Sequence, residues 1–255
     1  MIKIENVEVL GWEHAIRGMR NPMNSWEKSD SDYRPILCQK CDTCPTFSDE
    51  TWDDCYGCNT HKLTEEHEGF MVGPNDHQLM TSLAKGGPVH AKYRRMITVY
   101  LDITAPLYWW KEFDTYKVGT VANSCSTMHK IHAKEFELSD FSTEHLMHMD
   151  QIDLPYKSSV KFIFDFKSMM DDIIAALNNA REMYLETHDK KYWWQMIQLL
   201  PTSYNQKRTV MLNYEVLVNI YESRRHHKLD EWHTFCDWIE SLPYSELITG
   251  TSDNE

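Results

Sequence analysis

One run constrains the fold of this chain more than any other: LPTSYNQKRTVMLNYEVLVNIYESR, at residues 200–224. Pro201 belongs to a loop, and residues 207–212 have the β-branched and apolar content of a short strand. The residues after them have the spacing of a helix that ends at about 226. Asn213 stands at the junction and is a favoured residue type for a helix N-cap. The run therefore predicts a loop, a strand and a helix in direct succession.

Similar patterns recur along the chain and predict an α+β protein. Strands are expected at 2–10 and 96–104, and helices at 12–20, 74–85, 106–116, from about Asn123, 165–187, 190–199 and 229–241. Pro106 is expected at the first helical position of its helix. The predicted fold is a twisted, mostly antiparallel sheet packed by several helices, with the long helix 165–187 in a central place. Residues 1–255 are expected to form one domain, with 24–62 as an irregular cysteine-rich insert.

Composition excludes some classes of function. The chain has 255 residues, 42% hydrophobic and 25% charged, which is typical of a folded protein. Its net charge of −13 argues against general nucleic-acid binding, because phosphate backbones need a basic surface. No apolar run approaches the roughly 20 residues of a membrane span. The N-terminus has no secretory signal pattern, so a cytoplasmic protein with reduced cysteines is expected.

The cysteines of the insert have the spacing of metal ligands. They are Cys38, Cys41 and Cys44, then Cys55 and Cys58, with His61 three residues further on. Two Cys-x2-Cys pairs can present four thiolates to a tetrahedral Zn²⁺. The preferred ligands of this structural site are Cys38, Cys41, Cys55 and Cys58, with Cys44 and His61 as alternatives for one of them. An iron–sulfur cluster and metal-free loop thiols are the competing interpretations.

The C-terminal run also has a spacing that suggests chemistry. Pro201 lies twelve residues before Asn213, and Arg224 lies eleven residues after it. This spacing resembles the C-terminal half of the flavin-dependent thymidylate synthases. The resemblance implies that Asn213 and Asn219 contact FAD and that Arg224 holds the phosphate of dUMP, all from one side of the helix. Without it, Asn213 is an N-cap and the other two are ordinary helix residues, with a cation at the helix C-terminus.

A second stretch, TYKVGTVANSCSTM at 115–128, resembles the Arg-His-Arg motif of that family and departs from it. Thr115, Tyr116 and Lys117 stand where Arg-His-Arg is expected, Met128 replaces a final Arg, and Glu215 replaces another Arg. The resemblance implies further cofactor contacts by Tyr116, Lys117, Asn123 and His90, and further substrate contacts by Thr120, Ser124 and Ser126. The hydroxyl-rich stretch also suits backbone contact with an anion, although a plain loop with an N-cap explains it as well.

The resemblance implies an enzyme that reductively methylates dUMP, or a related pyrimidine nucleotide, at C5. It implies FAD, NADPH as reductant, methylene-tetrahydrofolate as carbon donor, and a homotetramer with active sites between subunits. No protein nucleophile is expected, because reduced flavin supplies the hydride. One alternative is a catalytically altered or inactive nucleotide-binding homologue whose metal-stapled insert docks a partner. Another is an enzyme on the same scaffold with a different nucleotide or carbon donor.

Two further features have competing interpretations. Trp109, Trp110 and Phe113 have helical spacing, which favours the core over stacking on a flavin. Cys125 lies in the second stretch and is a candidate nucleophile, but a small buried residue is the preferred interpretation.

Overall fold

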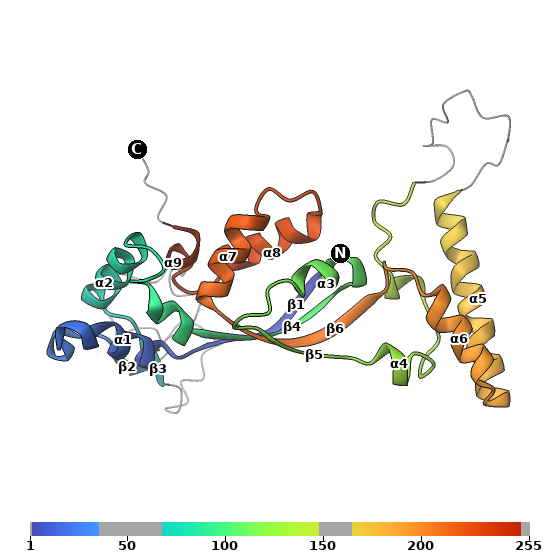
Figure 1. The fold of residues 1–255 in the computed structure, drawn as a ribbon, viewed down its shortest axis with the longest axis horizontal. Helices are drawn as coiled ribbons and strands as arrows, with labels where there is room; N and C mark the ends of the chain where they lie inside the picture. The colour runs from blue at the N-terminus through green and yellow to red at the C-terminus, as the bar shows by residue number, and fades with distance from the viewer. Residues whose placement is uncertain (1, 36–67, 148–164, 251–255) are drawn as a thin grey trace, which may run out of the picture. The chain divides into compact units, whose positions relative to one another are not determined.

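The computed structural model describes residues 2–35, 68–147 and 165–250, which fall into two compact units (Figure 1). Unit 1 comprises Met1–Leu10 and Thr98–Glu255, and unit 2 comprises Gly11–Ile97. The single domain with an insert at 24–62 stays a prediction. Among the described residues, no helix combines the length and apolar content needed to span a membrane.

Unit 1 is built on a four-stranded sheet in which every neighbouring pair is antiparallel. Across the sheet the strands are β1 (Lys3–Leu10), β4 (Thr98–Pro106), β6 (Asn205–Asn213) and β5 (Val121–Ser124). Together with its helices, this sheet confirms the predicted α+β class. It also places β6 between β4 and β5, so the strand at the centre of the C-terminal run has a partner on each side.

Helices cover one face of this sheet. Figure 1 shows α3 (Leu107–Phe113), α7 (Tyr214–Arg224) and α8 (Asp230–Glu240) on the same face. Alternate residues of β4, including Val99, Leu101 and Ile103, are buried, as expected for a strand with one covered face. Trp109, Trp110 and Phe113 are also buried, which confirms the core interpretation of these aromatic residues. A short helix that the sequence did not predict, α9 (Glu246–Thr249), follows α8.

The sequence predicted a central place for the long helix, and this prediction is wrong. Instead α5 (Phe166–Thr187) pairs with α6 (Lys190–Leu199) at one end of unit 1, and Asp165 and Asp189 cap their N-termini (Figure 1). The two helices enclose a core of their own with nearby loops, made of Ile131, Phe136, Phe141, Met170, Leu177, Ala180 and Met196. The amphipathic pattern indicates that one face of a helix is buried, but not which surface buries it.

Two local predictions are wrong. Pro106 is the N-cap of α3 and not its first helical residue, because its extended backbone (φ −67°, ψ 151°) still belongs to β4. Residues 24–62 were expected to be irregular, but Asp32–Pro35 forms β2, which pairs with β3 (Glu68–Met71). The ring of Tyr33 packs edge-on against Phe70 at 5.3 Å between centroids and supports that pair.

Unit 2 contains the predicted helices α1 (Trp12–Arg20) and α2 (Pro74–Lys85), which are confirmed. Its shorter elements are β2, β3 and the 3-10 helices η1 (Asn21–Met23), η2 (Trp26–Lys28) and η4 (Lys92–Met96). α2 begins at Pro74 after Gly73, whose missing side chain cannot cap the helix. Another segment of the unit therefore has to satisfy the first N–H groups of α2.

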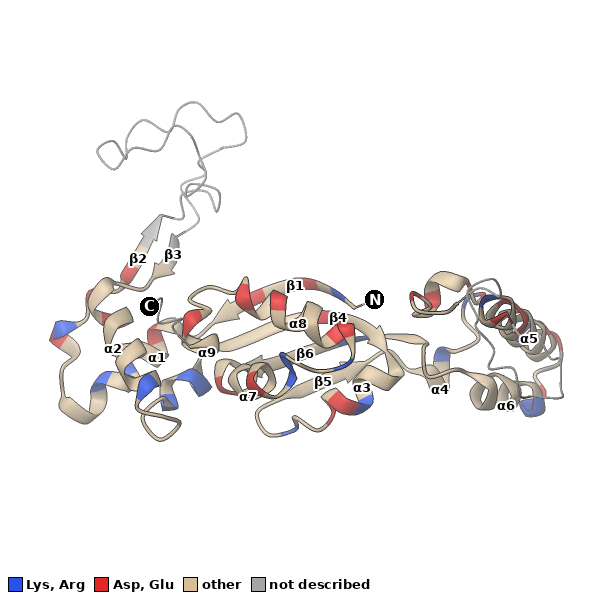
Figure 2. Cartoon of the chain, turned by 90° about the horizontal axis from the view of Figure 1, so that it is seen from above, with Lys and Arg blue, Asp and Glu red and all other residues tan. Residues whose placement is uncertain are grey.

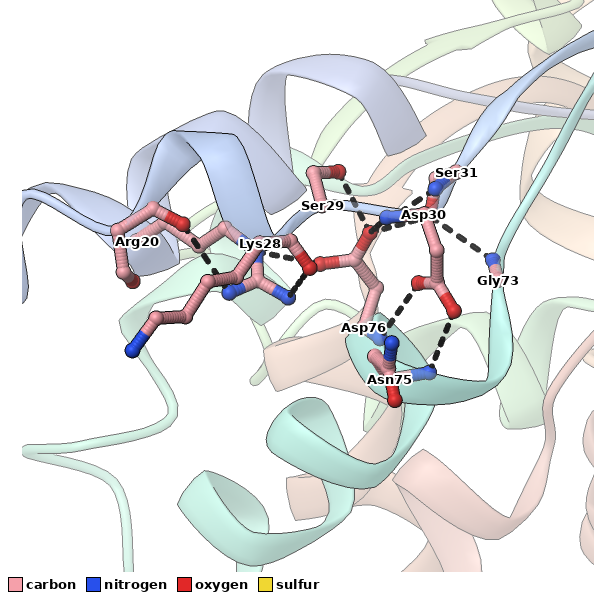
Figure 3. Close-up of polar contacts among 9 residues, drawn as sticks. Arg20, Lys28, Ser29, Asp30, Ser31, Gly73, Asn75 and Asp76 are labelled. Atoms are coloured by element: carbon pink, nitrogen blue, oxygen red, sulfur yellow. Dashed lines mark hydrogen bonds and ion pairs between the residues drawn. The ribbon is translucent and has the colours of Figure 1, made fainter.

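Residues 29–31 satisfy the first N–H groups of α2 and surround the buried carboxylate of Asp76 (Figure 3). Asp76 accepts hydrogen bonds from Arg20 Nε and from the hydroxyls of Ser29 and Ser31, each at 2.6 Å. In return, Asp30 accepts the backbone N–H groups of Asn75 at 2.8 Å and of Asp76 at 3.1 Å. Burial alone would raise the pKa of Asp76, but the hydrogen bonds from Ser29, Ser31 and Arg20 hold it below its ordinary value.

Asp76→Ala is expected to destabilise the protein by about 3–5 kcal/mol, because it leaves the buried Arg20 guanidinium without its counter-ion. Urea denaturation followed by circular dichroism measures the loss. The pKa of Asp76 is lowered by folding, so its contribution is complete above its ordinary pKa of 3.8 and is lost as the pH falls through the lower folded value. Asp171→Ala, at an exposed position of α5, is the control and should change stability by less than about 0.5 kcal/mol. Equal effects of the two substitutions would contradict this account.

Candidate functional site

The C-terminal run folds as predicted, with Asn213 between β6 and α7. Its side-chain Oδ1 accepts the backbone N–H of Val216 at 3.1 Å, and its backbone is extended. The predicted N-cap is therefore confirmed. Asn213 Nδ2 remains a donor that the cap does not use, at the edge where α7 begins.

The second stretch is a strand where the sequence predicted a helix from about Asn123. Val121–Ser124 forms β5, which pairs Asn123 with Thr209 and Ser124 with Arg208 of β6. Backbone pairing with β6 outweighs the local helical pattern. All residues of β5 are exposed, and the strand lies at the edge of the sheet. Ser126 follows β5 and caps the short helix α4 (Thr127–Lys130) by accepting the N–H of His129 at 3.0 Å.

The loop between α3 and β5 brings the two motifs together at Gly119. Gly119 has φ +83°, and a Cβ at this position would lie 3.0 Å from Asn213 Nδ2 and 3.1 Å from Val216 Cγ2. Glycine is required here both for the left-handed backbone and for the close approach. The loop therefore contacts the N-terminal end of α7 directly.

The same loop also contacts the C-terminal end of α7, through Arg224. Arg224 Nε donates to the hydroxyl of Tyr116 at 2.8 Å, and Nη1 donates to Glu112 Oε2 at 2.8 Å. The guanidinium carbon lies 4.9 Å from the ring centroid of the buried Trp232 and 5.6 Å from that of Tyr116. Among the described residues, Nη2 has no hydrogen-bond partner. Arg224 is thus a fixed cation with one amino group open to a ligand.

Glu112 is the common acceptor of this cluster. Its Oε2 also accepts Trp232 Nε1 at 3.1 Å and lies 3.2 Å from His227 Nε2. His227 Nδ1 accepts the backbone N–H of Leu229 at 3.2 Å, which orients the ring with Nε2 toward the carboxylate of Glu112.

The helix that presents Trp232 is acidic. α8 has the sequence DEWHTFCDWIE, with four carboxylates and no Lys or Arg (Figure 2). One of them, Glu231, accepts a hydrogen bond from the hydroxyl of Tyr108. Burial and this carboxylate raise the pKa of Tyr108, so the phenol stays protonated at neutral pH. The helix that packs Trp232 against Arg224 therefore carries negative charge and no cation of its own.

The remaining predicted residues of unit 1 are distributed around these contacts. Asn219 is exposed, and five residues of helix put it about 140° around α7 from Arg224, so the expectation that they share one side is wrong. Lys117 is exposed in the loop. Thr120 Oγ1 is buried and has no hydrogen-bond partner among the described residues.

Several predicted residues are not part of this cluster. His90 is exposed and belongs to unit 2. Cys125 is exposed, so the expectation of a small buried residue is wrong, because it directly follows the edge strand β5. Cys236 is buried, and burial raises the pKa of its thiol to about 11. The proposed metal ligands, Cys38, Cys41, Cys44, Cys55, Cys58 and His61, lie outside the described residues.

Sequence reasoning missed Glu112, His227 and Trp232. Glu112 and Tyr116 are four residues apart at the end of a predicted helix, so their common orientation could have been inferred. His227 lies among the charged residues that follow Arg224, and no local pattern there indicates a contact with Glu112. Trp232 comes from another helix, and no local pattern relates it to Glu112.

No family model and no curated protein matches this sequence. Solved structures do match. The flavin-dependent thymidylate synthase ThyX from Helicobacter pylori, complexed with FAD and dUMP, is 14% identical with a TM-score of 0.56, covering 97% of each chain. The UMP/dUMP methylase PolB from Streptomyces cacaoi, bound with 5-Br dUMP, is 13% identical with a TM-score of 0.50, covering 94% of this chain and 89% of that one. This chain therefore has the fold of the flavin-dependent thymidylate synthases, as its sequence motifs predicted.

Gly119→Ala is expected to destabilise the protein by about 2–3 kcal/mol, from backbone strain and from contact with Asn213 and Val216. Thermal denaturation measures the loss. Gly250→Ala is the control, because Gly250 has φ +82° with nothing within 4 Å of the added Cβ. It should lose only the strain, about 1 kcal/mol. If both substitutions cost the same, the loop does not approach α7 as closely as described.

Proposed function

We propose that this protein is an enzyme that binds FAD and a pyrimidine nucleotide and reductively methylates the nucleotide, dUMP or a relative, at C5. One observation carries the proposal. The loop after α3 contacts both ends of α7, through Gly119 at Asn213 and through Tyr116 at Arg224. The two sequence motifs therefore contribute to one surface, on a fold that a dUMP-bound and FAD-bound enzyme shares.

The residues present fit a bound flavin nucleotide. Asn213 Nδ2, Asn123 and Asn219 offer amide groups, which suit the alternating donors and acceptors of a flavin ring. Lys117, Tyr116 and the exposed β5 edge offer a cation, a hydroxyl and backbone groups for a pyrophosphate. For His90 an FAD contact is proposed from the sequence resemblance alone. When bound and reduced, FAD would supply the hydride, and the protein residues would bind and orient the two ring systems.

Arg224 is the proposed anchor of the nucleotide. Its Nε and Nη1 are fixed by Tyr116 and Glu112, so little side-chain freedom is lost when Nη2 takes a ligand oxygen. Ser124, Ser126 and Thr120 are proposed to add hydroxyl contacts. NADPH is proposed as reductant and methylene-tetrahydrofolate as carbon donor, with no protein nucleophile. A cytoplasmic homotetramer, with active sites between subunits, is the proposed assembly.

A nucleotide-binding homologue without catalysis is the alternative, and a specific observation favours it. Thr115 and Met128 cannot replace the guanidinium groups expected at their positions, and Arg224 is already paired with Glu112. Retention of FAD separates the enzyme from this alternative. The choice of nucleotide then separates dUMP methylation from a related reaction.

Protein incubated with FAD and desalted is expected to keep the flavin absorbance bands and to oxidise NADPH faster when dUMP is added. Arg224→Ala should keep the bands and weaken dUMP binding about 10- to 100-fold, as expected for a lost hydrogen bond to a charged group. Arg225→Ala is the matched control, because Arg225 is the exposed neighbour that lies over the Tyr221 ring at 5.1 Å. A colourless protein that takes up no FAD would contradict the enzyme proposal. Binding of dUMP without FAD would support the alternative.

We also propose that Zn²⁺ is bound by Cys38, Cys41, Cys55 and Cys58, on the strength of their spacing. About one zinc per chain is expected by mass spectrometry of protein purified without chelator. Cys38→Ser should lose the metal, whereas Cys125→Ser, outside the cysteine-rich segment, should keep it. Iron with inorganic sulfide would replace this proposal with an iron–sulfur cluster, and metal-free protein would leave loop thiols.

A further inference from the structure

The guanidinium of Arg224 has an internal counter-ion, Glu112. Nη1 and Oε2 are 2.8 Å apart, and the two side chains are 18% and 34% exposed. Screening by solvent is incomplete at such exposure, so the carboxylate lowers the positive potential that Arg224 offers to a ligand. Tyr116 and Glu112 use the Nε–H and one N–H of Nη1, so a ligand oxygen has to share the guanidinium with a carboxylate that is already bound to it.

The carboxylate of Glu112 is held independently of Arg224. Trp232 Nε1 donates to Oε2 at 3.1 Å, and His227 Nε2 lies 3.2 Å from the same oxygen. The hydrogen bond from the buried Trp232 keeps the carboxylate in place when Arg224 meets a ligand. Glu112 is therefore a carboxylate held beside the guanidinium of Arg224.

We propose that Glu112 is a specificity-determining residue that acts through Arg224 and weakens its attraction for an anionic group of the nucleotide. This inference rests on the proposed function for the identity of the ligand. The phosphate of dUMP would feel the attraction of Arg224 and the repulsion of Glu112 together. An uncharged nucleoside would feel neither to the same extent, so Glu112 reduces the advantage of nucleotide over nucleoside.

The chain offers a matched control pair on the same segment. Asp114 accepts from Arg208 Nη1 at 2.7 Å, and the guanidinium carbon of Arg208 lies 4.1 Å from the ring centroid of Trp110. This is also an Arg–carboxylate pair beside a tryptophan, but it does not involve Arg224. Neutralising Asp114 removes the same charge from the segment without changing the partner of Arg224.

The experiment compares Glu112→Gln with Asp114→Asn, using calorimetric titration with dUMP and with 2′-deoxyuridine. Gln keeps an oxygen that accepts from Arg224 and Trp232, so the cluster retains its hydrogen bonds. Glu112→Gln is expected to raise dUMP affinity about five- to tenfold and to change deoxyuridine affinity less than about twofold. Asp114→Asn should change neither. The inference is overturned if Glu112→Gln leaves dUMP affinity unchanged or lower, or raises both affinities equally.

A second measurement separates this inference from the proposed function. Inorganic phosphate is titrated while the side-chain Nε–H resonance of Arg224, assigned with Arg224→Lys, is followed by nuclear magnetic resonance. If neither protein binds dUMP, the proposed function fails, but a phosphate response at lower concentration in Glu112→Gln still supports the charge effect. An unchanged response overturns it. Glu112→Met, uncharged and of similar volume, replaces Glu112→Gln in both measurements if that variant does not fold.

Discussion

The candidate site depends on the pairing of β6 with a strand on each side. β4 pairs with the whole of β6, from Asn205 to Asn213, and β5 pairs with residues 208–211 of β6. This pairing fixes the start of α7 at Asn213 and at the same time fixes the second motif beside it. Without β5 on β6, the loop that carries Gly119 and Tyr116 would have no fixed relation to α7, and the two motifs would be separate features of the chain.

The arginines that the resemblance leads one to expect at Thr115 and Met128 are absent, and the positive charge of the site lies elsewhere. The cation comes from the end of α7, and Glu112 of α3 and Tyr116 of the loop after it hold it. α8 adds Trp232 and a row of carboxylates. Glu112 lowers the positive potential of this fixed guanidinium, so Arg224 attracts a phosphate less strongly than an unpaired arginine would. The proposed function and the alternative without catalysis both have to accommodate this arrangement.

Unit 2 also contains an arginine that is paired with a carboxylate, Arg20 with Asp76, and here the pair stabilises the fold. Gly73 has no side chain to cap α2, so Asp30 accepts the N–H groups of Asn75 and Asp76, and the carboxylate of Asp76 binds Arg20. The buried pair is stable because every group in it has a partner, which is the condition under which charges can be buried. β2 directly follows residues 29–31, and β3 ends two residues before Gly73, so the network lies next to the β2–β3 pair in the chain.

The sequence by itself determined the elements whose signals are local: the β6–α7 junction with its Asn213 cap, the long helix begun by Asp165, and the buried aromatic face of α3. It also determined the fold class, because the spacing of Pro201, Asn213 and Arg224 can be compared with the spacing in a known family without any structure. Only the tertiary structure decided that Asn123 lies in an edge strand, that the long helix packs with α6 away from the sheet, and that Arg224 meets Glu112 and Trp232. These depend on contacts between residues far apart in the chain, where the pairing partner outweighs local propensity. The spacing of residues along the chain does not show which distant residue is the contact partner.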